Sequence, residues 1–140
     1  MNKLNGHITQ IESSDHMSIV EIDVDGDIFS SIVLETPSTA AYLKLGSPVT
    51  MLFKETEVSI GKNLSGLISL RNRFKGVIKR IEKSDILAKV VIDYKGKEII
   101  SVITSRSVKK LGLIDGDAVE WLVKTNEVSL WADTSSDLTL

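Results

Sequence analysis

The stretch Leu87-Ala-Lys-Val-Val-Ile-Asp-Tyr-Lys-Gly-Lys-Glu-Ile-Ile-Ser-Val-Ile103 decides the fold of this chain. Apolar and β-branched residues dominate 87–92 and 98–103, as is typical of two short strands. Between them, Asp93-Tyr-Lys-Gly-Lys97 predicts a hairpin turn in which Gly96 adopts a positive φ. The stretch therefore predicts an antiparallel hairpin at the centre of a β domain.

The residues around this hairpin complete a small β domain with one helix. Further strands are expected at 76–81, 118–123 and 128–131, where apolar residues again dominate. Hydroxyls at 104–107 can cap a helix, and Gly112 can end it. Three strands, a helix and two strands in about 60 residues are typical of a small Greek-key barrel of the OB type.

The same pattern occurs twice in the chain. A shift of 70 residues places Ile11-Glu-Ser-Ser-Asp15 over Ile81-Glu-Lys-Ser-Asp85, and Lys54 over Lys124. About one third of the aligned positions are identical, mainly turn glycines and alternating apolar residues, which a shared fold requires. The sequence therefore predicts a tandem duplication of an all-β fold with short helices.

The duplication predicts two domains, over 1–62 and 68–133, followed by a loose tail over 134–140. Each domain is expected to form an OB-like five-stranded barrel with one helix. Pro37 would lie in the first turn of the helix of the first repeat, a position that tolerates proline. Because domains this small bury little surface alone, the two copies are expected to share a core or to exchange strands.

Composition excludes several classes of protein. The chain has no cysteine, which excludes disulfide frameworks, zinc–thiolate sites, iron–sulfur clusters and thiol catalysis. Its two histidines, His7 and His16, lack a second ligand at metal-binding spacing, so neither a protein-ligated metal nor an enzymatic activity is expected. No apolar run approaches the ~18 residues that span a bilayer, and the first residues lack the apolar core of a signal peptide. The interpretation is a cytoplasmic protein without a membrane partner.

Charge and local chemistry direct attention to the second repeat. The net charge of −2 divides into −5 over the first 70 residues and +3 over the last 70. Three clusters there differ from their counterparts in the first repeat: Ser69-Leu-Arg-Asn72, Thr104-Ser-Arg-Ser107 and Lys124-Thr-Asn126. Together they offer hydroxyls, an arginine and a lysine, a set that suits a tetrahedral oxyanion. Taken singly, such residues beside turns are usually capping or solvated residues.

These clusters and their order resemble the Mop, or TOBE, family of small molybdate-binding domains, and in particular its two-domain proteins of the ModG type. That family opens a domain with Ser-Ala-Arg-Asn, and Ser69-Leu-Arg-Asn72 is similar to it. Its helix start Ile-Thr-x-x-Ser matches 103–107, its Leu-Gly-Leu-x-x-Gly matches 111–116, and its final Lys-Ala/Thr-x-x-Val matches 124–128. The resemblance is strong over 69–131 and weak over 2–60.

The resemblance implies an OB-like fold with exchanged strands, assembly into trimers, and binding of molybdate or tungstate between domains. No organic cofactor is implied. Arg71 and Lys124 would supply positive charge, and Ser69, Thr104 and Ser107 would supply hydroxyl or amide donors. Thr125 would offer its backbone N–H. The weaker candidates are Asn72 and Lys54. The implied function is reversible oxyanion binding for storage, buffering or delivery.

The first repeat departs from the family pattern. Met1 stands at the arginine position, Leu34 at the threonine position and Pro37 at the serine position, while Glu35 and Glu55 bring acids near the expected site. A carboxylate facing a dianion is unfavourable in a partly buried site. Fewer sites are therefore expected than in a protein with two intact motifs, and the first repeat is expected to serve mainly as a structural partner.

An OB-type fold is also compatible with two functions other than oxyanion binding. Nucleic-acid binding by an OB-type barrel needs a basic groove with aromatic stacking platforms, whereas aromatic residues make up 5% of this net acidic chain. No nucleic-acid partner is therefore expected. The alternative that stays open is a ligand-free regulatory or protein-interaction module that kept the fold and lost the site.

Overall fold

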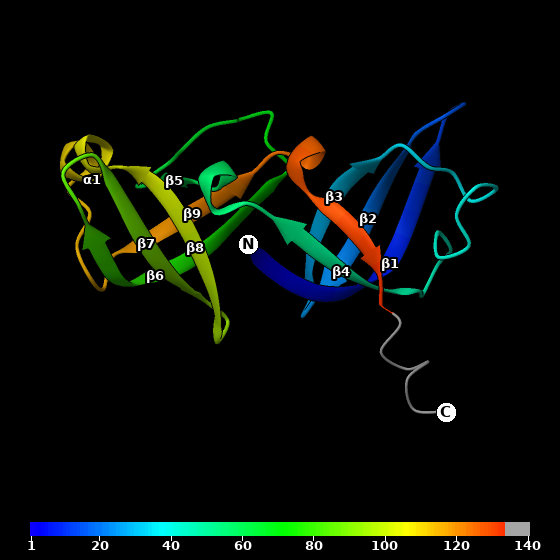
Figure 1. Cartoon of the computed structure of the whole chain (residues 1–140), viewed down its shortest axis with the longest axis horizontal. Helices are drawn as coiled ribbons and strands as arrows, with labels where there is room; N and C mark the ends of the chain where they lie inside the picture. Colours follow the sequence, from blue (N-terminus) through cyan, green and yellow to red (C-terminus); the bar gives the residue numbers. More distant parts are fainter. Residues whose placement is uncertain (134–140) are drawn as a thin grey trace. The chain divides into compact units, whose positions relative to one another are not determined.

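The computed structural model describes residues 1–133, which form two five-stranded antiparallel sheets (Figure 1). One sheet has the strand order β10-β4-β1-β2-β3, and the other has the order β5-β9-β6-β7-β8. The predicted all-β fold, with two five-stranded OB-like sheets, is confirmed. The elements in chain order are β1 (Asn2–Ser13), β2 (Ser18–Val24), β3 (Asp27–Val33), β4 (Pro48–Phe53), η1 (Glu55–Glu57), β5 (Ser59–Gly61), β6 (Asn72–Lys83), β7 (Leu87–Tyr94), β8 (Lys97–Thr104), α1 (Ser105–Leu111), β9 (Ala118–Val123), η2 (Thr125–Glu127) and β10 (Ser129–Ala132).

Each sheet takes one outer strand from the other repeat. Ser59 of β5 pairs with Leu122 of β9, and Ser129 of β10 pairs with Leu52 of β4 (Figure 1). The predicted exchange of strands is therefore present in the chain. Among the described residues, the compact units consequently cross the repeats: unit 1 comprises 1–2 and 54–123, and unit 2 comprises 3–53 and 124–133. The division into repeats at 1–62 and 68–133 remains a description of the sequence, and the predicted tail over 134–140 lies outside the described residues.

The hairpins follow the turn chemistry of the sequence. Lys95 and Gly96, between β7 and β8, have φ angles of 51° and 84°, and Asp25 and Gly26 have 50° and 92°. Two consecutive positive φ angles belong to the tight turn that matches the twist of a two-stranded ribbon. The positive φ predicted for Gly96 is confirmed. Within β1 and β6 the pairing register shifts at equivalent places, between Ile8 and Gln10 and between Ile78 and Arg80.

The helix predicted for the second repeat is present, whereas the one predicted for the first repeat is wrong. Thr104 caps α1, and Gly112 ends it at a φ of 64°. In the first repeat, turns occupy 34–46 instead. There Thr39 Oγ1 accepts from the N–H of Thr36 and donates to its carbonyl, at 2.9 and 3.1 Å. Such local bonds compete with a helix, and Pro37 removes one N–H donor from the segment.

The core of unit 1 contains an aromatic cluster. The ring of Trp121, which is fully buried, lies 5.4 Å from that of Phe74 and 5.2 Å from that of Tyr94. The core of unit 2 is aliphatic around two phenylalanines, with Phe29, Phe53, Met51 and Ile22 almost completely buried. Within residues 1–133, no helix is long and apolar enough to cross a membrane.

A two-point ion pair joins β6 to β9 in unit 1. Arg73 Nε donates to Glu120 Oε2, and Arg73 Nη2 lies 3.0 Å from Glu120 Oε1. The hydrogen bond from Arg73 holds the pKa of Glu120 below its ordinary value. A carboxyl group with a lowered pKa in the folded state stabilises the fold at neutral pH and loses that effect on acidification.

We therefore expect Arg73→Gln to lower the free energy of unfolding at pH 7 and to have a smaller effect in acid. The Arg73–Glu120 pair stabilises the fold fully above the pKa of a glutamate in the unfolded chain, about 4.3. This stabilisation is lost as the pH falls through the lower pKa of Glu120 in the folded state. Urea unfolding of both proteins from pH 7 to pH 3 measures this difference. A difference that is independent of pH would contradict the assignment.

The first strand contributes a buried side chain to unit 1. Asn2 Nδ2 donates to the carbonyl of Ile100, and Asn2 Oδ1 accepts from the N–H of Ile100, both at 2.8 Å. Asn2 thus satisfies both backbone groups of a residue in β8, which is the outer strand of its sheet. Removing such a partner leaves polar groups without their bonds and costs about 1–3 kcal/mol.

Asn2→Ala is expected to destabilise the protein by that amount, about 1–3 kcal/mol. Asn5→Ala provides a matched control, because the Asn5 side chain is exposed and makes one bond, from Thr50 Oγ1 at 2.9 Å. Denaturant unfolding of both variants should show a clear loss for the first and a small change for the second. Equal effects would show that the Asn2 contacts are not important for stability.

Candidate anion-binding site

Two of the predicted site residues lie together where β8 meets α1. Thr104 Oγ1 accepts from the N–H of Ser107 at 3.1 Å and donates to Ser107 Oγ at 2.9 Å. Thr104 is exposed and Ser107 is half-buried. Because the Thr104 hydroxyl donates to Ser107, the hydroxyl proton of Ser107 remains available for an acceptor in solvent. The arrangement can therefore present a hydrogen-bond donor to an anion.

Ser69 and Arg71 lie in the exposed segment that leads into β6. Within residues 1–133, neither side chain makes a hydrogen bond or an ion pair. An arginine without a carboxylate partner has its charge and all its N–H donors available to a ligand. Asn72, by contrast, is fully buried as the first residue of β6.

Arg71 and Lys124 each adjoin, along the chain, one residue of the same β6–β9 pair. Asn72 pairs with Val123, the last residue of β9. Arg71 directly precedes Asn72, and Lys124 directly follows Val123. Lys124 is exposed and is the N-cap residue that precedes η2, while Thr125 is the first residue of η2. By compactness Lys124 and Thr125 belong to unit 2, whereas Ser69, Arg71, Thr104 and Ser107 belong to unit 1.

Buried serines bond to the backbone just after η1 and η2, the short helices that the candidate lysines Lys54 and Lys124 directly precede. Ser31 Oγ donates to the carbonyl of Val128, just after η2, at 2.6 Å in unit 2. Ser101 Oγ makes the equivalent bond to the carbonyl of Val58, just after η1, at 2.6 Å in unit 1. Sequence reasoning missed these positioning residues. The signal that could have found them is the identity of Ser31 and Ser101 in the alignment of the two repeats.

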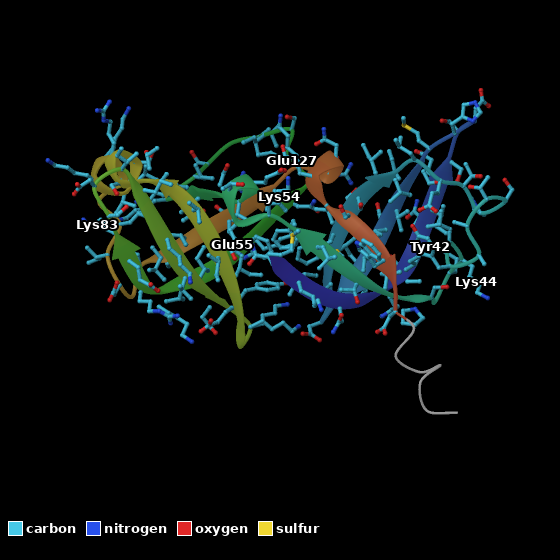
Figure 2. All side chains as sticks on the ribbon, in the orientation of Figure 1. Tyr42, Lys44, Lys54, Glu55, Lys83 and Glu127 are labelled. Atoms are coloured by element: carbon cyan, nitrogen blue, oxygen red, sulfur yellow. The ribbon has the colours of Figure 1, made fainter. Side chains whose placement is uncertain are left out.

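The first repeat places carboxylates where the second has hydroxyls. Glu55, at the position of Thr125, lies 3.0 Å from the amino nitrogen of Met1, and Lys54 beside it is exposed (Figure 2). Glu35 Oε1 accepts from the Tyr42 hydroxyl at 2.7 Å. Burial, together with this bond to Glu35, raises the pKa of Tyr42. Glu35 and Glu55 of the first repeat thus each have a polar partner within the chain.

The chemistry of the predicted site is that of donors and cations. Among the described residues, no group of three or more histidine, cysteine or acidic side chains could hold a metal ion. Hydroxyls, a guanidinium and an ammonium bind an anion without proton transfer. Two five-stranded sheets, each with one outer strand from the other repeat, define a tandem OB-like protein.

Comparisons with known proteins give the family. The TOBE domain model matches residues 68–130. Molybdenum-pterin-binding protein 1 of Clostridium pasteurianum is 35% identical over 66 residues, which are 46% of this chain and 97% of that protein. The chain belongs to the TOBE/Mop domain family. The predicted family resemblance is therefore confirmed.

A longer relative and a solved structure cover more of the chain. The molybdenum import ATP-binding protein ModC of Brucella abortus (strain 2308) is 32% identical over 111 residues, or 79% of this chain, but the match spans only 29% of ModC. The crystal structure of ModG, a cytoplasmic molybdate-binding protein, with molybdate bound, superposes with a TM-score of 0.88 at 27% identity. That match covers 94% of this chain and 96% of ModG. The chain thus has the ModG fold, and both ModG and the Clostridium protein are named as binding proteins.

Proposed function

We propose that the chain binds molybdate or tungstate reversibly in the cytosol, for storage, buffering or delivery of molybdenum. The observation that carries the proposal is the match along almost the whole chain to ModG with molybdate bound. The Clostridium relative, which is also named for molybdenum, supports it over 46% of this chain. The chain matches less than a third of ModC, so the proposal is limited to binding and does not extend to transport.

The proposed ligand-binding residues are Ser69, Arg71, Thr104, Ser107, Lys124 and Thr125. Molybdate is a tetrahedral dianion, so Arg71 and Lys124 can balance its charge while hydroxyls and N–H groups donate to its oxygens. The exposed, unpaired state of Arg71 and the available proton of Ser107 support these roles. Arg71 directly precedes Asn72 and Lys124 directly follows Val123, and Asn72 and Val123 pair in the register of β6 and β9.

The first repeat is proposed to contribute less. Glu35 and Glu55 carry negative charge at positions where the second repeat has Ser105 and Thr125, and Leu34 replaces Thr104. Lys54 is the remaining candidate cation of the first repeat, and Glu55 follows it directly. A dianion near these carboxylates would be repelled. We accordingly expect fewer bound oxyanions per chain than two intact repeats would hold.

The proposal also includes assembly of the chain into homo-oligomers, with the trimer as the expected form. In such an assembly a second copy can supply donors that one chain lacks. Light scattering after size-exclusion chromatography, with and without molybdate, measures the state directly. A monomer under both conditions would contradict this part of the proposal.

Equilibrium dialysis against molybdate and tungstate, with metal analysis of both compartments, tests the function itself. Sulfate and phosphate serve as competitors, because they share the tetrahedral shape and differ in size. Retention of molybdenum or tungsten that a large excess of sulfate does not displace would support the proposal. Absence of retention would favour the alternative, a protein-interaction module that kept the fold and lost the site.

A further inference from the structure

A basic hollow of about 520 Å³ lies in unit 1, between the β6–β7 turn and α1. Its lining residues are Lys83, Ser84, Asp85, Ser105, Arg106 and Lys109. Within residues 1–133, none of the three cations makes an ion pair or a side-chain hydrogen bond. Figure 2 shows Lys83 at the end of β6, beside this turn. Three free cations against one acid leave the hollow with a net positive charge.

Internal hydrogen bonds hold the two sides of the hollow together. Ser105 N–H donates to the carbonyl of Ile86 at 2.8 Å, and Ser105 Oγ donates to the carbonyl of Ser84 at 2.7 Å. Ser84 Oγ donates to the carbonyl of Leu87 at 2.9 Å. Both hydroxyls are therefore committed to the backbone, and the cationic side chains provide the positive charge on a fixed frame.

The hollow is distinct from the proposed oxyanion site. Along α1, Arg106 and Lys109 are three residues apart and share one side of the helix, whereas Ser107 lies roughly 100° around the axis from Arg106 and about 200° from Lys109. Thr104 bonds Ser107 and so belongs to the side of Ser107. The hollow is also several times larger than one tetrahedral oxyanion requires.

The fold itself does not require this charge. In the aligned first repeat, Ser13, Thr36 and Thr39 stand where Lys83, Arg106 and Lys109 stand in the second repeat, and Glu35 replaces Ser105. The equivalent place in unit 2 thus carries no cation from these positions. The basic set is specific to the second repeat, so the shared fold does not explain it.

We propose that this hollow docks an acidic segment of a partner protein. Cations placed at the end of a strand and along a helix suit a chain with several spaced carboxylates better than one compact anion. Ile86, whose side chain is 74% exposed, is held beside the hollow by Ser105 and offers an apolar contact. The lining has no aromatic residue on which a nucleic-acid base could stack.

Fluorescence anisotropy with the full chain tests the proposal. The probe is a fluorescein-labelled peptide, Glu-Glu-Leu-Glu-Glu-Leu-Glu-Glu, and the competitors are tripolyphosphate and a 12-residue oligothymidylate. The variant Lys83→Gln/Arg106→Gln/Lys109→Gln should bind the peptide at least tenfold more weakly, and Ile86→Ser severalfold more weakly. Both variants alter exposed residues and should keep their melting temperature. Molybdate binding of the triple variant should be unchanged, which separates this proposal from the proposed function.

The matched control is Lys3→Gln/Lys44→Gln/Lys75→Gln, which removes the same charge from exposed positions elsewhere. It should keep peptide affinity within about twofold. Equal losses in the two triple variants would overturn the proposal, because net charge would then explain binding. No binding of the peptide by the native chain would overturn it as well. Displacement of the peptide by both competitors at equal charge concentration, with no effect of Ile86→Ser, would show a nonspecific polyanion patch and would also overturn it.

Discussion

Arg71→Ala is expected to weaken molybdate binding about 10- to 100-fold while leaving the fold intact. Charge-assisted hydrogen bonds contribute about 1.5–3 kcal/mol, and each 1.4 kcal/mol is tenfold in affinity. Arg71 is exposed and its side chain makes no hydrogen bond or ion pair within residues 1–133, so its removal costs the folded chain little. Lys124→Ala should weaken binding in the same range, because it removes the second proposed cation. Calorimetric titration of each variant measures the loss, and the melting temperature checks the fold.

Two variants control for charge alone. Arg80→Ala removes an exposed arginine of the same unit that already pairs with Glu82 at 3.2 Å, and it should leave molybdate affinity nearly unchanged. Lys54→Ala removes the lysine equivalent to Lys124 and should have a smaller effect than Lys124→Ala. Native affinity in both Arg71→Ala and Lys124→Ala would contradict the site assignment. A loss in Lys54→Ala as large as that in Lys124→Ala would show that the first repeat still binds.

Gly76→Val is expected to destabilise the protein by about 1–3 kcal/mol, the usual cost of overpacking a core. A Cβ atom at Gly76 would lie 3.0 Å from the backbone carbonyl oxygen of Asp93 and closer still to Ile92 Cγ2. The carbonyl belongs to the paired strand β7 and has little freedom to move. The indole of Trp121, 3.4 Å from that Cβ position, blocks the remaining side. Gly6 has the same environment in unit 2, against the Asp23 carbonyl.

Ala118→Val provides the matched control for Gly76→Val. Ala118 is exposed in β9 opposite Val77, so the same valine side chain is added to the same pair of strands, but in solvent. Its effect on the free energy of unfolding should stay within about 0.5 kcal/mol. Urea unfolding distinguishes the two positions. Similar stabilities of the two variants would show that the close approach at Gly76 is not a constraint on the fold.

The strands were predictable because period-two hydrophobicity and turn glycines are local signals. The hairpin around Gly96 and the helix capped by Thr104 both follow from such signals. The helix expected around Pro37 was wrong, because proline at the first helical turn is permitted but does not enforce a helix, and the threonine hydroxyls bond locally instead. The short helices η1 and η2 were not predicted, since three residues leave no periodic pattern.

The candidate site was predictable in part. The spacing of Thr104 and Ser107 indicated a shared helix start, and the structure joins their hydroxyls. The assignment of Lys124 and Thr125 to unit 2 could not be derived from order along the chain, because it depends on which sheet receives β10. Nor could the sequence reveal the bond between Glu35 and Tyr42, whose seven-residue separation reflects the irregular turns of the first repeat.

Calorimetric titration of the intact protein with molybdate, with sulfate as the control anion, tests the central claim most directly. Saturable binding of molybdate with little response to sulfate is the expected result. The number of molybdate ions bound per chain should be lower than in a chain with two intact repeats. The reason is that the first repeat carries acidic residues at the equivalent positions. No heat from either anion across a range of temperatures, together with no retention in dialysis, would contradict the claim that this chain is an oxyanion-binding protein.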